Sequence, residues 1–300
     1  MAKALLVYYS GTGNTAIAAK FLQKHLMERG YDVDLYFAQK PYWLLPDLSR
    51  YDLLGFGYPI HAFNTPLNFL KFLKKFPRGH QPYFIFRVSG EPFRPNCCSS
   101  HPIYRILKRK GYQYRLDKHF LMPYDIVFRY KDSLAKQMYL YLDALTEAYA
   151  EKITRGIKEK PHNPLDVLLW SILLRIEWIA GPVNCKLVHV KKKKCLRCDG
   201  CIRGCPTHAL YRNKKGVIRV HPSCNICMHC VMNCPSDAFI FGFLNPWKVV
   251  GNYPYEKLVA NPGIDAHYVN PKTKGYFRHF RKYFLAQDAF LKEYGVPIPK

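Results

Sequence analysis

Acidic residues are scarce in this sequence, which has 21 Asp and Glu against 46 Lys and Arg and a formal net charge of +25. An excess of this size attracts acidic proteins, nucleic acids or anionic lipids, and it does not choose among them. Long apolar runs are missing too, because no window offers the uninterrupted span that a transmembrane helix needs. The N-terminal residues MAKALLVYYSGTGNT pass from an apolar stretch into a Gly-rich turn without a cleavable signal. We therefore expect a cytoplasmic protein without a transmembrane span.

Two nucleotide-binding motifs are also absent from the Gly-rich turn at residues 10–15. The turn has no Lys where the G-x-x-x-x-G-K-[ST] motif requires one, which argues against hydrolysis of a nucleoside triphosphate. Its spacing differs from G-x-G-x-x-G, which argues against a site for NAD(P)H. The length, in contrast, is generous: 300 residues with 49% hydrophobic content can bury more than one core, so we expect two domains.

Cysteine is concentrated in one stretch of the chain. Of the 11 cysteines, eight lie between residues 195 and 234, where C-x2-C-x2-C-x3-C-P occurs twice at an offset of 29 residues. A secreted disulfide network would require a signal sequence. In a zinc finger, a third Cys two residues after the first pair would crowd the tetrahedral site. We therefore favour iron–sulfur clusters over disulfides and zinc.

The repeated motif resembles the one with which bacterial ferredoxins bind two [4Fe–4S] clusters. In those proteins three closely spaced thiolates hold one cluster, and the Cys before Pro crosses to the other. The resemblance implies one cluster on Cys195, Cys198, Cys201 and Cys234, and another on Cys224, Cys227, Cys230 and Cys205. Between residues 191 and 242, ten Lys and Arg stand against two acidic residues, Asp199 and Asp237. This excess would partly balance the anionic clusters and attract an acidic redox partner.

The first thirty residues predict a phosphate-binding unit. An apolar strand at 4–9 precedes Ser10, Gly11, Thr12, Gly13, Asn14 and Thr15, and a helix follows over 16–30. At the start of such a helix, backbone N–H groups and hydroxyls bind phosphate, and a loop without a cation suits a phosphate monoester. An ordinary strand-to-helix turn is the alternative. Residues 10–15 match the flavodoxin FMN phosphate loop, [ST]-x-T-G-x-T, at each specified position, and this resemblance implies FMN.

The elements that follow are in flavodoxin order as well. The pattern predicts strands over 32–37, 52–59, 82–88 and 119–123, and helices over 66–76, 99–110 and 132–155. Five alternating strand–helix units predict an α/β fold with a flavodoxin-like, doubly wound, parallel five-stranded sheet. In such sheets ligands bind beyond the carboxyl ends of the strands. The cysteine motif that follows predicts a small α+β ferredoxin domain.

Two further loops would hold the flavin ring if the resemblance extends to them. They contain Tyr58, Pro59, Ile60, His61, Ala62, Phe63 and Asn64 after the third strand, and Ser89, Gly90 and Glu91 after the fourth. Tyr58 and Phe63 are candidates for covering the ring. The tyrosine that flavodoxins usually carry in the loop after the fourth strand is missing here. The side of the flavin ring next to this loop is therefore either open or covered by Phe93 or the second domain. His61 is either a donor to the ring or a solvent-facing loop histidine, and we favour the latter.

The chain thus divides into a flavodoxin-like domain (1–155), a linker with an amphipathic helix (156–190), a ferredoxin domain (191–242) and a basic, aromatic extension (243–300). The linker's apolar stripe is Leu165, Leu168, Leu169, Ile172, Leu173 and Ile176. We expect this stripe to pack between the domains, with a membrane surface as the alternative. For the extension, we expect a packed segment that shields the clusters. We expect Cys97 and Cys98 to be small buried residues rather than reactive thiols.

As a whole, the chain resembles the flavodoxin–ferredoxin fusion proteins of anaerobic bacteria and archaea. The resemblance implies an iron–sulfur flavoprotein that transfers electrons between two [4Fe–4S] clusters and FMN, with an acidic electron carrier or a downstream redox enzyme as partner. FMN accepts one or two electrons, whereas each cluster passes one. The alternative is an FMN-dependent reductase of a small organic substrate, whose clusters refill the flavin. A nucleic-acid-associated role is the least favoured, a homodimer is compatible with the family, and no catalytic residue can be named.

Overall fold

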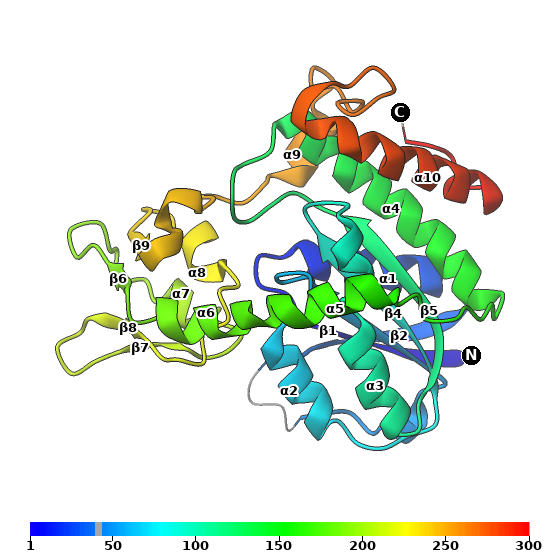
Figure 1. The fold of residues 1–300 in the computed structure, drawn as a ribbon, viewed down its shortest axis with the longest axis horizontal. Helices are drawn as coiled ribbons and strands as arrows, with labels where there is room; N and C mark the ends of the chain where they lie inside the picture. Colours follow the sequence, from blue (N-terminus) through cyan, green and yellow to red (C-terminus); the bar gives the residue numbers. More distant parts are fainter. Residues whose placement is uncertain (40–43, 300) are drawn as a thin grey trace.

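The computed structural model describes residues 1–39 and 44–299, which form a larger lobe and a smaller, cysteine-rich lobe (Figure 1). The larger lobe is built on a five-stranded sheet in the order β2-β1-β3-β4-β5, and each neighbouring pair is parallel. Its strands are β1 (Ala2–Tyr8), β2 (Tyr31–Phe37), β3 (Leu53–Pro59), β4 (Pro82–Ser89) and β5 (Gln113–Leu121). This order is that of flavodoxin-like doubly wound sheets, so the predicted α/β class is confirmed.

Helices cover both faces of the sheet. Helices α1 (Asn14–Met27) and α4 (Asp132–Thr154) share one hydrophobic core, and α2 (Leu67–Lys75) and α3 (His101–Arg109) share the other. Strand β3 is buried on both sides from Leu53 to Tyr58, as its apolar sequence predicts for a central parallel strand. The loops after β1, β3, β4 and β5 therefore emerge together at the carboxyl edge of the sheet.

The fifth strand differs from the prediction. It begins at Gln113, six residues before the predicted start at 119. Within the described residues it is an edge strand that pairs with β4, and among its first seven residues only Leu116 is buried. Because such a strand is solvated along one side, it lacks the continuous apolar run that identifies the central strands.

The smaller lobe consists of two similar halves. Strand β6 (Val188–Val190) pairs with β9 (Phe239–Phe241), and β7 (Leu210–Arg212) pairs with β8 (Ile218–Val220), both antiparallel. Short helices α7 (Gly200–Arg203) and α8 (His229–Met232) begin 29 residues apart. Positive φ angles recur at the same offset, at Arg197 and Ile226 (54° and 56°) and at Asp199 and Met228 (54° and 58°). The sequence repeat is therefore also a repeat of backbone conformation.

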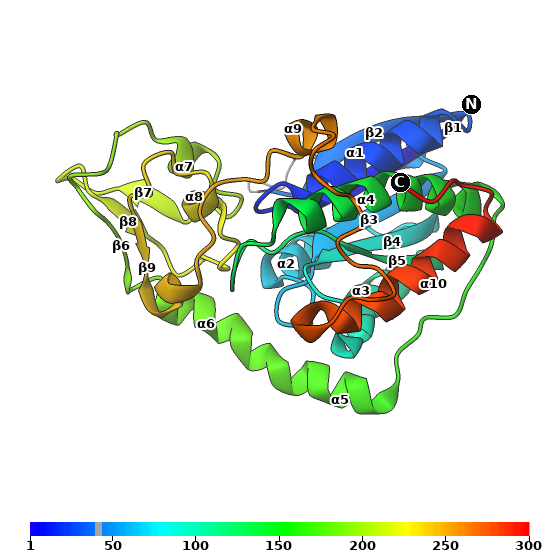
Figure 2. The same cartoon turned by 90° about the horizontal axis from the view of Figure 1, so that it is seen from above.

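The linker forms helices α5 (Leu165–Leu173) and α6 (Glu177–Asn184), joined by a 3-10 turn, and it connects the two lobes along one outer edge (Figure 2). The predicted packing of its apolar stripe is wrong. Val167 and Ser171 are the buried residues of α5, whereas Leu165, Leu169 and Leu173 are exposed. The side chain of Ile176, also assigned to the stripe, lies outside the described residues. The face of α5 that packs against the molecule is the one that carries Val167 and Ser171.

The C-terminal extension packs against the larger lobe. Helix α9 (Tyr255–Ala260) contacts α4, and α10 (Phe280–Glu293) lies along α4 in Figure 1. Phe280 and Phe284 of α10 join the core beneath α4. The start of the extension does pack on the cysteine-rich lobe, where Leu244 contacts the core that contains Cys205 and Cys230 and Lys248 pairs with Asp237. The expected shielding is therefore limited to this start, because the aromatic residues of α10 complete the α1–α4 side of the sheet instead.

Candidate functional site

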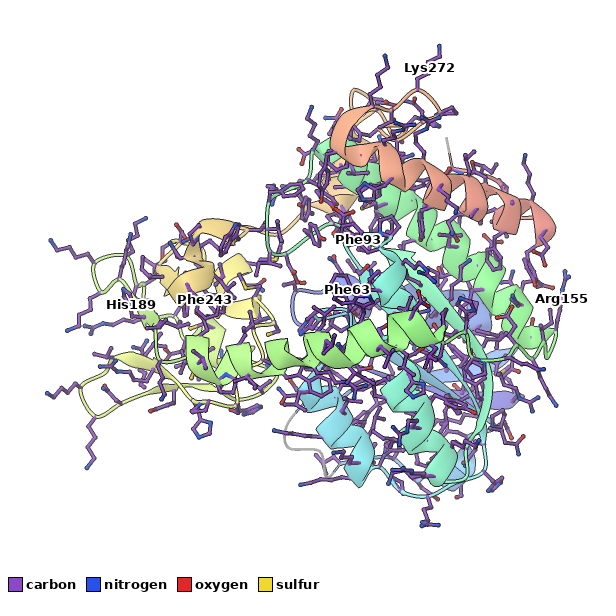
Figure 3. The ribbon with its side chains drawn as sticks, viewed as in Figure 1. Phe63, Phe93, Arg155, His189, Phe243 and Lys272 are labelled. Atoms are coloured by element: carbon purple, nitrogen blue, oxygen red, sulfur yellow. The ribbon has the colours of Figure 1, made fainter. Side chains whose placement is uncertain are left out.

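A cavity of about 580 Å³ lies between the two lobes. It is bounded by the loops at the carboxyl edge of the sheet, by α2 and α6, and by residues 222–226 and 243–244 of the smaller lobe. Figure 3 labels Phe63 and Phe93, which lie close together on the larger lobe with ring centroids 6.3 Å apart, and Phe243 from the smaller lobe. The volume of the cavity falls within the range of small-molecule and cofactor pockets.

Most of the residues predicted to bind the cofactor line this cavity. They are Ser10, Gly11, Thr12, Asn14, Thr15, Pro59, Ile60, His61, Ala62, Phe63, Ser89, Gly90 and Glu91. Tyr58 does not line it and is fully buried in the α2–α3 core, where its hydroxyl lies 3.0 Å from Ser99 Oγ. Its predicted role in covering a ring is therefore wrong, because β3 still alternates its side chains at this position. Gly13 and Asn64 are not among the residues that line the cavity.

The loop after β1 folds around its first hydroxyl. Ser10 Oγ accepts hydrogen bonds from the backbone N–H groups of Gly13 (3.2 Å) and Ala16 (3.4 Å). Gly13 has a φ of 107°, which side chains rarely adopt, so glycine is required there. The turn thereby presents the N-terminus of α1, a 14-residue helix, to the cavity. This is the arrangement that binds phosphate groups.

Several polar groups in the cavity wall are unsatisfied. Within the part of the chain that the structure describes, Thr15 Oγ1, Asn68 Nδ2 and Trp178 Nε1 are buried and have no hydrogen-bond partner. All three residues line the cavity, as does Lys71, one turn after Asn68 on α2. Buried donors without a partner are costly and rare in folded proteins. The wall is therefore suited to a polar, anionic ligand such as FMN, and Lys71 supplies a cation that the phosphate loop lacks.

The loop after β3 is held in place by the linker. Ala62 and Phe63 have positive φ angles of 49° and 60°. Asn64 Nδ2 donates to the carbonyls of Ala62 (3.0 Å) and Ser171 (2.9 Å), and Ser171 Oγ donates to Asn64 Oδ1 (2.9 Å). Helix α5 thus fixes the loop in a strained conformation that directs Phe63 toward the cavity.

His61 belongs to the same loop and lines the cavity. Burial lowers its pKa to about 4, so the ring is neutral near pH 7. His61 is half-buried and faces the cavity, and its role, as a donor to the ring or as a solvent-facing loop histidine, stays a prediction. A neutral imidazole can still donate one hydrogen bond to a ligand, but it supplies no positive charge.

The loop after β4 is anchored by the C-terminal extension. Glu91, which is 1% exposed, accepts hydrogen bonds at Oε1 from Tyr130 (2.9 Å) and Tyr276 (2.6 Å), and its Oε2 pairs with His279 Nε2. The His279 ring also stacks on Phe93, with centroids 5.5 Å apart. Residues nearly two hundred positions apart in sequence thus build one wall of the cavity. The sequence carried no signal for this contact.

The loop after β5 contributes a carboxylate that the sequence analysis missed. Asp125 lines the cavity and accepts a hydrogen bond from Thr12 Oγ1 at 3.0 Å. Burial raises the pKa of Asp125 to about 6, against the opposing effect of the Thr12 hydrogen bond. A carboxyl that stays partly protonated is compatible with a neighbouring phosphate, whereas an ionised one would repel it.

Four cysteines, Cys205, Cys224, Cys227 and Cys230, form an inner set beside this cavity. Burial, followed by the nearby thiol of Cys205 among other groups, raises the pKa of Cys224 to about 11. Burial also raises the pKa of Cys227, and the nearby thiols of Cys224 and Cys205 and the carboxyl of Asp125 raise it further. Burial raises the pKa of Cys230 as well, followed by the thiols of Cys227, Cys224, Cys205 and Cys201. The assignment of Cys205 to the set with Cys224, Cys227 and Cys230 stays a prediction of the ferredoxin resemblance.

The inner set touches the phosphate loop directly. A Cβ placed on Gly11 would lie 2.5 Å from the carbonyl oxygen of Cys227, and one on Gly181 of α6 would lie 2.2 Å from that of Cys224. His229 Nδ1 donates to the Gly11 carbonyl (2.8 Å), and Asn225 Nδ2 donates to the Tyr9 hydroxyl (2.6 Å). Gly11 and these two hydrogen bonds therefore hold the inner cysteine loop against the larger lobe, and Gly181 places linker helix α6 against the same loop.

The other four cysteines, Cys195, Cys198, Cys201 and Cys234, form an outer set around a separate small cavity. Burial, followed by the thiols of Cys195 and Cys198, raises the pKa of Cys201 to about 11. Cys198 is exposed, and so are the four lysines at 191–194. The two acidic residues of this lobe are neutralised, Asp199 by Arg212 Nε at 2.8 Å and Asp237 by Lys248. The surface around the outer set is therefore strongly basic.

The two sets are equivalent in their sulfur contacts. Cys205 Sγ accepts a hydrogen bond from the Ala209 N–H and Cys234 Sγ from the Ala238 N–H, both at 3.3 Å. All eleven cysteines are free. Within residues 1–39 and 44–299, no three His, Cys, Asp or Glu side chains are grouped to hold a single metal ion.

Cys97 and Cys98 lie outside both sets, in the 3-10 turn Arg94–Cys98. Cys98 is buried, and burial, followed by the neighbouring Cys97, raises its pKa to about 12. A thiol of this kind is a small core residue rather than an activated nucleophile. Separately, none of the helices in the described residues is long and apolar enough to cross a membrane.

Comparisons with known proteins give partial likenesses. No protein-family model matches the chain. Thiosulfate reductase electron transfer subunit PhsB of Salmonella typhi is 36% identical over 73 residues, covering 21% of this chain and 37% of that protein. The chain thus spans little more than a third of this relative. A flavodoxin of Streptococcus pneumonia TIGR4 has a TM-score of 0.38 at 17% identity and covers 52% of this chain and 100% of its own. A flavodoxin from the domain Archaea has a TM-score of 0.34 at 17% identity, and the match covers 51% of this chain and 99% of that flavodoxin.

Proposed function

We propose that this chain is an electron-transfer iron–sulfur flavoprotein, with two [4Fe–4S] clusters and one FMN held in a single chain. One observation carries the proposal: the loop with Cys224 lines the same cavity as the phosphate loop, and Cys227 touches Gly11 of that loop. A cluster on the inner set and a flavin in the cavity would thus be neighbours within one molecule. The distant relative, named as an electron transfer subunit, is consistent with this role.

In this proposal the residues divide into three groups. Ser10 and Thr15, with the N-terminus of α1, would hold the FMN phosphate. Phe63 and Phe93, with the loops that carry them, would enclose the flavin ring, and the smaller lobe would cover the side where the usual tyrosine is missing. The outer cysteine set, exposed and surrounded by lysines, would exchange electrons with an acidic carrier. FMN supplies the ability to accept one or two electrons, whereas each cluster passes one.

Anaerobic cofactor analysis with a stepwise redox titration tests this function. The expected protein contains about one FMN and about eight irons per chain, and absorbance and EPR follow electrons distributing between flavin and clusters. Eight irons without flavin after reconstitution would refute the flavin assignment of the cavity. Flavin without iron would refute the cluster assignment of the eight cysteines.

Reduction of a small anionic substrate is a second candidate. The observation in its favour is that Lys71 and the unsatisfied Trp178 Nε1 line the cavity outside the phosphate loop. Turnover of reduced protein with a small organic acceptor, and no protein acceptor, would support this candidate. If Lys71→Ala leaves FMN affinity intact but lowers such turnover, the two roles of the cavity are separated.

A further inference from the structure

An exposed apolar stripe runs along the linker helices. Its exposed members are Leu165, Leu169, Ile172 and Leu173, which helical spacing places on one face of α5, and Ile179 and Val183 on α6. Trp170, 61% exposed, lies beside the stripe. Proteins that remain free in water rarely expose a contiguous apolar surface of this length, and such surfaces usually contact a partner or a membrane.

The opposite face of the linker is fixed to both lobes. Ser171 is hydrogen-bonded to Asn64 of the larger lobe, and Gly181 packs against the backbone of Cys224 in the smaller lobe. The helices therefore cannot rotate to bury the stripe without breaking these contacts. Figure 2 shows α5 and α6 along the outer edge of the molecule, where the solvent-facing side is unobstructed by other elements.

Positive charge lies at both ends of the stripe. Residues 156–194 contain eight Lys and Arg and three Asp and Glu. Lys158 and Lys160 are exposed before α5, and Lys186 and the lysines at 191–194 are exposed after α6. Asp166, the acidic residue of α5, is paired with Arg94 at 2.7 Å. The apolar line is thus bordered by cations and has little negative charge.

We propose that this stripe docks the protein on the surface of an anionic lipid membrane. The leucine and isoleucine side chains enter the headgroup–acyl boundary, and the flanking lysines contact anionic headgroups. Trp170 is of the residue type that prefers this boundary. A second copy of the chain is a poorer occupant, because two molecules of charge +25 repel each other. The helices lie on the membrane and do not cross it.

Cosedimentation of the holoprotein with vesicles tests the proposal. The protein is expected to bind vesicles of phosphatidylcholine and phosphatidylglycerol, and to bind phosphatidylcholine alone much more weakly. Leu169→Glu should weaken binding to the anionic vesicles about tenfold or more, because a buried leucine is replaced by a charge. Leu285→Glu on α10 is the matched control, since Leu285 is 57% exposed and Leu169 is 56% exposed. This control should bind like the wild type.

Tryptophan fluorescence gives a second readout. Anionic vesicles should shift the emission to shorter wavelength, and Trp170→Phe should remove most of this shift while binding remains. The proposal is overturned if the wild type does not bind, or if Leu169→Glu and Leu285→Glu bind equally well. It is also overturned if analytical ultracentrifugation finds a dimer that Leu169→Glu dissociates, without vesicle binding. In that case a second copy covers the stripe.

Discussion

The inner and outer cysteine sets have the same sequence pattern and different surroundings. Each set has three cysteines two residues apart and a fourth before proline, and each fourth thiol accepts the same backbone hydrogen bond. The inner set is covered by the larger lobe and adjoins the large cavity, whereas the outer set includes the exposed Cys198 among lysines. One ligand motif can thus serve an internal and an external redox site, because the surrounding chain decides what can approach it.

Removing one ligand from each set should give the largest contrast. Cys227→Ser is expected to lose the inner cluster and with it the transfer of electrons from an external donor to the flavin. Cys198→Ser should slow exchange with the external carrier but keep exchange between flavin and the inner cluster. Each variant should retain about four of about eight irons. Iron analysis, EPR and stopped-flow absorbance measure these effects. If both variants lose electron transfer between the inner cluster and the flavin to the same extent, the assignment of an inner and an outer cluster is contradicted.

One added methyl group between the two lobes should affect the inner cysteine set and leave the outer set unchanged. Gly11→Ala should force Cys227 away, because the new Cβ would lie 2.5 Å from its carbonyl oxygen. Overpacking of this kind typically costs about 1–3 kcal/mol, and it should slow transfer between the inner cluster and the flavin. Gly200→Ala is the control in the outer loop, where the new Cβ would meet only Cys198 Sγ, at 3.8 Å. Chemical unfolding measures the free energy of unfolding, and stopped-flow absorbance measures the rate of electron transfer. Equal values of both quantities for Gly11→Ala and Gly200→Ala would argue against the idea that the Gly11–Cys227 contact sets the transfer rate.

Acidity should affect the cavity through Asp125. Its pKa is raised to about 6 in the folded protein, above the ordinary value near 4, so the folded state binds the proton more tightly than the unfolded state. This contribution to stability is present below about pH 4 and is lost as pH rises toward 6. Asp125→Asn should therefore raise the free energy of unfolding at pH 7 relative to wild type by about 1–2 kcal/mol. Urea titrations from pH 4 to 7.5 measure the difference.

The exposed Asp265→Asn is the control for this experiment, because Asp265 lies in a solvated loop. If Asp125→Asn and wild type keep a constant difference across the whole pH range, Asp125 does not titrate in this way. FMN titrations of the wild type and of Asp125→Asn over the same pH range should show FMN binding to the wild type weakening as Asp125 ionises. The Asp125→Asn variant reports the effect of phosphate ionisation alone.

The smallest effect should come from the anchor of the C-terminal extension. Tyr276→Phe removes one of the donors to buried Glu91 and should lower stability by about 1 kcal/mol, with weaker FMN binding. Tyr211→Phe on β7 removes a hydroxyl from an exposed tyrosine of the smaller lobe and should change neither property. Thermal unfolding and flavin titration provide the two readouts. Equal behaviour of the variants would mean that the extension does not support the cavity.

The sequence predicted those features that depend on short segments. The central strands are continuous apolar runs, and the phosphate loop has local spacing, whereas the grouping of the cysteines follows from the ferredoxin resemblance and stays a prediction. The contacts between distant segments were not predictable. Nothing in Glu91 or His279 alone indicates that they meet, and nothing in Gly11 indicates that Cys227 lies against it. Helix periodicity located the apolar stripe of the linker but did not show what the stripe contacts. The pattern identifies an apolar face of a helix, and it does not tell whether that face packs against the rest of the protein.

In the proposed function, the inner cysteine set exchanges electrons with a flavin of the same chain. Stopped-flow reduction of the reconstituted protein, measured at two widely different protein concentrations, tests this most directly. Electron transfer between cluster and flavin should have the same first-order rate constant at both concentrations, because both groups belong to one molecule. A rate that rises in proportion to protein concentration would contradict the account and place the exchange between molecules.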